Sequence, residues 1–290
     1  MRIGIGLPTR ASDMAPELLF TWAERAERGP FSSVAVSDRV VYDSQEPLVA
    51  LAAVAGVTRR VRLVTSIVLA PTRETTLLAR QSATLDALSG GRLTLGVAVG
   101  AREDDYTATG TRFHRRGRRL DAQLPELRKI WSGAPIATGG VIGPAPHRLG
   151  GPELLIGGYL PVVARRIAAW GDGFLQPGGG DPGAMAALWS DIEKAWAAAG
   201  RGGRPRWVSG SYFALGPDAD AAADAYIKAT YAFDPKVAER RRKTLPTTPD
   251  AVRAAIARQA DMGVEEFILR PCTADIEHLD RLAELVVAVA

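Results

Sequence analysis

The sequence has little cysteine: Cys272 is the single one in 290 residues. One cysteine excludes an internal disulfide framework and a metal site of the CxxC type. No apolar run approaches the ~20 residues that a membrane-spanning helix needs. The opening MRIGIGLPTR has a strand pattern and not the architecture of a signal peptide. These absences predict a cytoplasmic protein with no membrane partner.

Several catalytic signatures are also missing. The chain has no HExxH, no GxxxxGK[ST] and no GxSxG, and its three histidines form no group with zinc spacing. Metal, ATP and acyl-transfer chemistry therefore have little support, and we expect no metal site. The first strand-to-helix turn, LPTRASDMAPE, lacks the glycine fingerprint of a dinucleotide-binding fold.

The charge is weakly basic, with a net charge of +4 and a pI near 9.4. The excess is concentrated in RRGRR (115–119) and ERRRK (239–243), and a basic patch can indicate nucleic acid. However, the first cluster continues as an amphipathic helix, with Leu120, Leu124 and Trp131 at helical spacing. Arginines that open such a helix usually form a solvated face. We expect no nucleic-acid partner and a modest preference for an anionic ligand.

Hydrophobic periodicity predicts a regular alternation of strands and helices. The predicted strands are Arg2–Leu7, Ser33–Val36, Arg62–Leu69, Leu93–Val97, Leu154–Ile156, Gly173–Leu175, Val208–Ala214 and Glu266–Leu269. The predicted helices are Pro16–Glu27, Pro47–Val57, Thr75–Leu88, Gly117–Trp131, Val162–Trp170, Met185–Ala199, Asp250–Met262 and Asp275–Val287.

This pattern is typical of an α/β chain folded as a (β/α)8 TIM barrel. The length suits a single domain over residues 1–290. Residues 132–152 and 226–249 have no regular pattern, and we expect them to be insertion loops over the C-terminal mouth of the barrel. An open, doubly wound sheet is the alternative that periodicity alone does not exclude.

Four segments together resemble the bacterial luciferase-like superfamily of flavin- and deazaflavin-dependent oxidoreductases. They are SDRVVYDSQEPLVALAAVAGVTRRVRLVTSIVLAPTRETTLLARQSATLD (37–86), DALSGGRLTLGVAVGAREDDYTATGTRFHRRGRRLDAQLPELRKIW (86–131), LLIGGYLPVVARRIAAWGDGFL (154–175) and TPDAVRAAIARQADMGVEEFILRP (248–271). They cover most of the chain in the order of the family.

The resemblance implies a barrel whose strand C-terminal ends hold a reduced flavin or 5-deazaflavin ring. The cofactor would be FMN, often supplied reduced by a separate flavin reductase, or the deazaflavin coenzyme F-420. The basic charge favours the reduced deazaflavin slightly, because the tail of that coenzyme is polyanionic. Pairing into a homodimer is common in the family.

Asp38 closes the second predicted strand, within Ser37-Asp38-Arg39. The resemblance places an acid there, paired with histidine or arginine, that hydrogen-bonds the cofactor or relays a proton. Asp38 and Arg39 are therefore candidate catalytic residues, and Asp38 is also a candidate cofactor contact. The alternative is that Asp38 holds the following loop through a salt bridge to Arg39. Arginine stays protonated near neutral pH, so Arg39 is not expected to act as a base.

The segment Thr65-Ser66-Ile67 corresponds, by the same resemblance, to a bulge with a non-prolyl cis peptide behind the cofactor ring. Thr65 and Ser66 are therefore candidate cofactor-binding residues. The alternative is an ordinary buried strand whose two hydroxyls bond the backbone.

Gly157, Gly158 and Tyr159 follow the fifth predicted strand and precede a helix. Exposed backbone N–H groups at such a turn suit the phosphate of the cofactor, which makes these three residues cofactor-binding candidates. The alternative is a tight turn with no ligand. Leu160 and Pro161 occupy positions where the family often has serine or threonine, so backbone amides would carry the contact.

The stretch LSGGRLTLGVAVGARED (88–104) contains a different set of glycines. Gly90 and Gly91 are expected to end a helix. Gly96 and Gly100 are expected to leave room for a flat ring beside the fourth strand, so Gly100 is a further cofactor-binding candidate.

Charged and aromatic residues after the fourth strand are candidates for substrate and proton contacts. Arg102 and His114 are candidate catalytic residues, and Tyr106 is a candidate substrate contact, against the alternative of a solvated charge run. Arg270 follows the eighth strand and could meet an anionic substrate or pair with a neighbouring acid. His278 lies on the last predicted helix and is expected to face solvent.

Together these observations predict an oxidoreductase that moves a hydride to or from a small organic substrate, or inserts one oxygen atom into it. One alternative is an FMNH2-dependent monooxygenase fed by a separate flavin reductase. Another is a barrel that binds the cofactor but has lost catalysis. This alternative is suggested by Arg39, which stands where several members of the family have a histidine.

Overall fold

The computed structural model describes residues 1–9 and 15–289. Eight parallel strands close into a barrel in sequence order, with β1 paired to both β2 and β8. The strands are β1 (Arg2–Gly6), β2 (Ser33–Val36), β3 (Arg62–Leu69), β4 (Leu93–Ala98), β5 (Glu153–Gly157), β6 (Gly173–Leu175), β7 (Arg206–Phe213) and β8 (Glu266–Pro271). The closed parallel barrel confirms the predicted TIM-barrel fold and excludes the open sheet.

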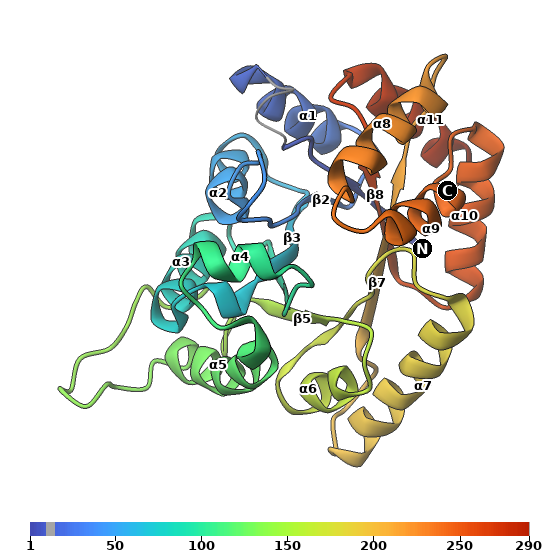
Figure 1. Ribbon diagram of the computed structural model, residues 1–290. Helices are drawn as coiled ribbons and strands as arrows, with labels where there is room; N and C mark the ends of the chain where they lie inside the picture. Colours follow the sequence, from blue (N-terminus) through green and yellow to red (C-terminus); the bar gives the residue numbers. More distant parts are fainter. Residues whose placement is uncertain (10–14, 290) are drawn as a thin grey trace.

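Helices surround the strands (Figure 1). They are α1 (Pro16–Arg28), α2 (Pro47–Val57), α3 (Thr75–Leu88), α4 (Glu103–Ala108), α5 (Arg116–Trp131), α6 (Val162–Trp170), α7 (Pro182–Ala198), α8 (Ala219–Thr230), α9 (Pro235–Thr244), α10 (Pro249–Asp261) and α11 (Ile276–Val289). Two short 3-10 turns, η2 (Ala70–Thr72) and η3 (Phe113–Arg115), follow β3 and α4. None of the helices in the described part of the chain has the length and hydropathy to cross a lipid bilayer.

Proline and a capping side chain begin four of these helices. Glu46, Asp181, Asp234 and Thr248 each precede a proline and accept a hydrogen bond from a backbone N–H of the first turn. The proline loses no hydrogen bond, because first-turn N–H groups have no partner within the helix. The cap satisfies one of the remaining donors. The local sequence therefore sets where α2, α7, α9 and α10 begin.

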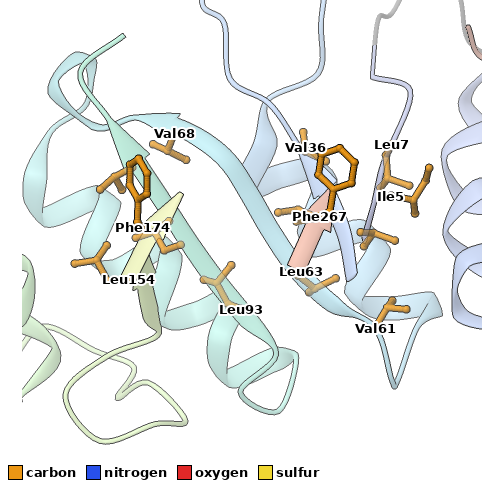
Figure 2. Packing of buried hydrophobic residues seen from close by; sticks show 14 of the residues in the cluster. Ile5, Leu7, Val36, Val61, Leu63, Val68, Leu93, Leu154, Phe174 and Phe267 are labelled. Atoms are coloured by element: carbon orange, nitrogen blue, oxygen red, sulfur yellow. The ribbon is translucent and has the colours of Figure 1, made fainter. Parts of the chain in front are cut away.

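Side chains of the strands alternate between two apolar layers. Those that point outward, including Leu63, Leu93 and Phe267, pack against the helices (Figure 2). The inward layer fills the middle of the barrel and comes from six strands: Ala35, Val64, Leu155, Leu175, Val208 and Ile268. A barrel interior filled in this way is a packed core and not a pore. A ligand can therefore bind only at an end of the barrel.

The N-terminal end of the barrel holds an ionic cluster that the sequence did not reveal. Arg206, at the start of β7, bridges Glu153 at the start of β5 and Glu266 at the start of β8. Glu266 is fully buried, and the Ser33 hydroxyl donates to it at 2.6 Å. Thr94 donates to Glu153, also at 2.6 Å. Barrel enzymes of this fold carry their active sites at the opposite, C-terminal end, so we interpret the cluster as structural.

Three helices depart from the prediction. The charge run after β4 forms α4, and α8 and α9 occupy most of the stretch 216–249 where no helix was expected. The prediction of an irregular loop at 226–249 is therefore wrong. Ala219, Ala223 and Ile227, four residues apart, bury one face of α8. The other predicted insertion, 132–152, contains no helix or strand. It leads from the end of α5 into the start of β5, so it lies at the N-terminal end of the barrel, and its predicted place over the C-terminal mouth is wrong.

Candidate active site

A cavity of about 230 Å³ lies at the C-terminal end of the barrel. The ends of strands β1, β2, β3, β7 and β8 contribute to its walls, together with the residues after β4 and the segment 219–244, called here the α8–α9 segment. Barrel enzymes carry their chemistry at this end. Six of the residues predicted from the sequence line the cavity: Asp38, Arg39, Ser66, Gly100, Arg102 and Arg270.

Asp38 follows β2 and is almost fully buried, with 3% of its side chain exposed. Its Oδ2 accepts hydrogen bonds from the Leu69 backbone N–H and from Arg73 Nη2, both at 2.9 Å. Burial raises the pKa of the Asp38 carboxyl, and the Arg73 guanidinium acts in the opposite direction. The ionic partner of Asp38 is thus Arg73, which lies 35 residues further along the chain, and not Arg39 as the alternative had it.

Arg39 pairs with a different carboxylate. Its Nε lies 3.5 Å from Oδ2 of Asp105, and its guanidinium lies 5.0 Å from the ring centre of Tyr42. Asp105 also accepts the backbone N–H groups of Val40 and Val41 at 3.0 and 2.8 Å. The Arg39–Asp105 pair therefore fixes the loop after β2 against α4 at the edge of the cavity.

Strand β3 is irregular where it meets the cavity. Its register with β4 shifts between Thr65 and Val68, and the peptide bond between Ser66 and Ile67 is cis, as the resemblance implied. Ser66 lines the cavity, whereas Thr65 bonds the neighbouring strand. The Thr65 hydroxyl donates to the carbonyl and accepts from the N–H of Gly96, both at 2.9 Å. Of the two predicted hydroxyls, the structure places Ser66 at the cavity.

Arg270 crosses the barrel mouth from β8 to β3, where its Nη2 donates to the Ser66 hydroxyl. Two glycines make room for it. A Cβ on Gly6 of β1 would lie 2.8 Å from Cγ of Arg270, and a Cβ on Gly210 of β7 would lie 2.5 Å from its Nη1. Both distances are shorter than real Cβ contacts, so any side chain at either glycine would displace the arginine. The guanidinium therefore forms a charged floor of the cavity.

Aromatic side chains form another wall, which sequence reasoning missed. Tyr212 at the end of β7, Tyr42 after β2, and Tyr226, Tyr231 and Phe233 of the α8–α9 segment line the cavity. The hydroxyls of Tyr212 and Tyr231 lie 3.2 Å apart. Burial raises the pKa of Tyr212 well above its usual value, so its phenol stays protonated. These rings come from segments far apart in the chain, so no local motif brings them together. The one signal in the sequence was the helical spacing of α8, which could have placed Tyr226 on a helix.

Gly100 and Arg102 lie at the cavity edge after β4. Gly100 has a φ of +66°, a backbone conformation that favours glycine. Arg102 pairs with Asp104, and its guanidinium lies 4.5 Å from the ring centre of Phe233. Gly96 does not line the cavity: a Cβ there would lie 2.2 Å from a carbonyl oxygen of β3. The expectation that Gly96 leaves room for a cofactor ring is therefore wrong. The glycine instead allows β3 and β4 to pack closely at this point.

Gly157, Gly158 and Tyr159 form the turn between β5 and α6 and do not line this cavity. Gly158 has a φ of +152°. The Tyr159 hydroxyl donates to the carbonyl of Gly178 at 3.2 Å and accepts from Arg241 Nη2 at 2.9 Å. An arginine of α9 thus reaches the turn where the sequence predicted a phosphate contact.

Three other predicted residues lie away from the cavity. Tyr106 is buried on α4 and its hydroxyl donates to the carbonyl of Val99, while His114 is exposed on η3. Neither lines the cavity, so the structure gives no support to substrate contact by Tyr106 or proton transfer by His114. The expectation that His278 faces solvent is wrong: it is 7% exposed, and its Nδ1 accepts the Leu215 N–H at 3.0 Å.

The cavity thus offers a buried carboxyl, a hydroxyl and a guanidinium between apolar and aromatic walls. Such a set can orient a flat ligand and hold a proton, but none of these side chains is itself a hydride donor. The described ranges contain no group of three or more histidine, cysteine, aspartate or glutamate side chains able to hold a metal ion.

The fold and this mouth define the class of protein. The family model described as luciferase-like monooxygenase matches residues 1–290, and the chain belongs to that family. It is thereby an enzyme of a group of flavin- and F420-dependent oxidoreductases and monooxygenases.

Individual relatives are more distant. An uncharacterized protein of Mycobacterium tuberculosis is 29% identical over 207 residues, which are 62% of this chain and 71% of that protein. The F420-dependent glucose-6-phosphate dehydrogenase of Kribbella flavida is 31% identical over 196 residues, 62% of this chain and 58% of that protein.

Solved structures share the whole fold at lower identity. Monooxygenase RslO1 from Streptomyces bottropensis superposes with a TM-score of 0.83 at 24% identity, covering 99% of this chain and 98% of its own. An F420-dependent secondary alcohol dehydrogenase gives a TM-score of 0.77 at 19% identity and covers both chains fully, at 100% each. At these identities the likeness concerns the fold.

Proposed function

We propose that the protein transfers a hydride between a deazaflavin of the coenzyme F-420 type and a small organic substrate bound at the barrel mouth. The observation that carries the proposal is the meeting of Asp38, Ser66 and Arg270 at the irregular part of β3, on the open end of a barrel of this family. The F420-dependent relative from Kribbella flavida supports the choice of cofactor. FMN is the alternative cofactor.

The cavity walls fit a flat ring. Ile67 and Leu69 of β3 offer apolar surface, and Gly100 adds no side chain. The Ser66 hydroxyl supplies a polar group for the edge of such a ring. These residues would hold the cofactor, which when bound supplies or accepts the hydride.

Asp38 is the group we propose to hold a proton for the substrate. Its Oδ2 already accepts two hydrogen bonds, so a proton on the carboxyl belongs on Oδ1. Burial raises the pKa of Asp38, which favours the protonated form. Arg73 holds the carboxyl in one orientation and thereby positions that proton.

The turn Gly157-Gly158 is the proposed site for the phosphate of the cofactor. It leads into the N-terminus of α6, where backbone N–H groups and the helix dipole favour an anion. Arg241 lies against the same turn through its bond to Tyr159, and its positive charge acts in the same direction.

Titration of the protein with oxidised coenzyme F-420 and with FMN, followed by ring fluorescence, tests the proposal. We expect coenzyme F-420 to bind with a Kd below about 100 μM, and Ser66→Ala to weaken that binding. Asp38→Asn should leave the affinity within a few-fold of the parent and lower turnover. Asp250→Asn, an exposed carboxylate on α10, is the matched control for both readouts. Failure to bind either cofactor would refute the proposal.

The cofactor that binds also decides between the two reactions. Binding of FMN alone, with oxygen consumed in proportion to substrate, would establish the monooxygenase fed by a separate reductase. Binding of coenzyme F-420, with substrate reduced or oxidised in the absence of oxygen, would establish hydride transfer.

A further inference from the structure

Among the residues that the structure describes, one guanidinium that lines the cavity has no ionic partner. The two carboxylates that line it, and the other two arginines, are each in an ion pair. Arg270 is the exception within the described residues, because its polar contact is the neutral hydroxyl of Ser66. A partly buried guanidinium of this kind favours an oxyanion, which it can bind through charge-assisted hydrogen bonds.

This arginine is built into the mouth and does not reach it by chance from a flexible surface. Gly6 and Gly210 leave the space through which it passes, and Ser66 fixes its end. Its position is therefore set by three other strands of the barrel, which is how a preorganised binding group is made.

The aromatic wall adds a second requirement. Tyr42, Tyr212, Tyr226 and Tyr231 are four of the six tyrosines in the chain, and Phe233 adds a phenyl ring. The faces of such rings stack on flat conjugated molecules. Burial raises the pKa of Tyr226 above its usual value, so the phenol carries no negative charge that would oppose an anion.

We infer that the substrate is a flat, conjugated acid, in which a carboxylate or phenolate oxygen is joined to an aromatic or similar ring. Arg270 receives the oxyanion, and the aromatic wall stacks on the ring. The inference rests on the function proposed above, because it assigns a substrate class to the same cavity. A saturated acid would pair with Arg270 but would not stack on the aromatic wall. A neutral arene would stack on the aromatic wall but would not pair with Arg270.

Binding of three matched probes tests the inference. They are naphthalene-2-carboxylate, its neutral isostere naphthalene-2-carboxamide, and the saturated decalin-2-carboxylate. Each is titrated calorimetrically into the whole protein, with and without the cofactor that the first titration selects. We expect the naphthalene acid to bind about tenfold or more tightly than the amide, as a charge-assisted hydrogen bond gives. We expect it to bind several-fold more tightly than the saturated acid.

Variants assign each preference to its residue. Arg270→Gln should abolish the preference for acid over amide, and Phe233→Leu should reduce the preference for the flat ring. Arg240→Gln removes the same charge from an exposed position on α9 and should change neither preference. Thermal unfolding of each variant confirms that it remains folded, and Phe233 is itself 45% exposed, so its replacement spares the core.

The outcomes separate this inference from the proposed function. Equal affinity for acid and amide, or an acid preference that survives Arg270→Gln, overturns the inference. Displacement of the probe by the cofactor also overturns it, because the cation then belongs to the cofactor site. A protein that binds a cofactor but no probe refutes the substrate class alone. A protein that shows both probe preferences but binds no flavin or deazaflavin refutes the proposed function and leaves the ligand class standing.

Discussion

Replacing Glu266 with glutamine tests how the N-terminal end of the barrel is held together. The carboxylate is fully buried and bonds both Arg206 and the Ser33 hydroxyl. The amide of glutamine keeps the shape and removes the charge, so Arg206 loses one of its two carboxylate partners. Removing one member of a buried ion pair costs about 3–5 kcal/mol. Because Glu153 remains as a partner, we expect the lower part of that range, about 3 kcal/mol.

Urea-induced unfolding followed by tryptophan fluorescence measures this loss. Trp207, which directly follows Arg206 and is buried, is one of the six tryptophans that contribute to this signal. Glu193→Gln is the matched control, because Glu193 pairs with Arg204 at 2.5 Å where the side chains are 36% and 76% exposed. Such a pair contributes less than about 1 kcal/mol. A loss in Glu266→Gln no larger than that in the control would refute the reasoning.

A double replacement shows whether the cost comes from an unpaired charge. Arg206→Met combined with Glu266→Met removes both members of the pair, and an apolar pair of similar volume avoids an uncompensated charge at these positions. Glu153 keeps an ionic partner, because its Oε2 lies 3.2 Å from Nη2 of Arg62. We expect this variant to be more stable than Glu266→Gln. Cofactor affinity should be the same in all three proteins, because the cluster lies at the opposite end of the barrel from the cavity.

Three further predictions concern the strands, the mouth and a buried histidine. Gly96→Ala should lower the free energy of unfolding by about 3 kcal/mol, the upper part of the usual cost of overpacking, because its Cβ meets a carbonyl oxygen; an unchanged urea midpoint would contradict this. Arg73→Gln should move the limb of the activity–pH profile that Asp38 sets to higher pH, because it removes the charge that lowers the pKa of that carboxyl; a limb that stays or moves down would count against the assignment. His278→Asn should remove an acid-linked loss of stability. Burial lowers the pKa of His278 below its usual 6.5, so the unfolded chain binds the proton more readily, and the stability present above pH 6.5 is lost as the pH falls through the folded pKa. Thermal unfolding between about pH 5 and 7.5, with the exposed His114→Gln as control, checks this, and equal slopes for both variants would argue against it.

Periodicity predicted the barrel well because every strand buries both faces and most helices bury one long apolar stripe. It failed at α8 and α9 for a physical reason. The buried face of α8 uses the small residues Ala219 and Ala223 with Ile227, which give a weak periodic signal, and α9 buries no residue completely. The capping pair Asp234-Pro235 is the signal that could have revealed the start of α9.

The site was predictable only in part. Asp38, Ser66 and Arg270 could be named because each lies at or near the end of a predicted strand. The pairing of Asp38 with Arg73 depends on how η2 packs beside β2, which a linear pattern does not contain. The aromatic wall was missed for the same reason, since its members come from four separate elements.

The passage of Arg270 between Gly6 and Gly210 has a consequence for how such a protein changes over evolutionary time. The atoms that a Cβ on Gly210 would meet all belong to the guanidinium of Arg270, so loss of the arginine removes this clash and allows a side chain at Gly210, which then hinders the return of the arginine. These two positions are therefore epistatic, and the loss of the arginine is hard to reverse. A lineage that abandons an acidic ligand at this mouth would regain it more readily through a new cation elsewhere than by restoring the old one.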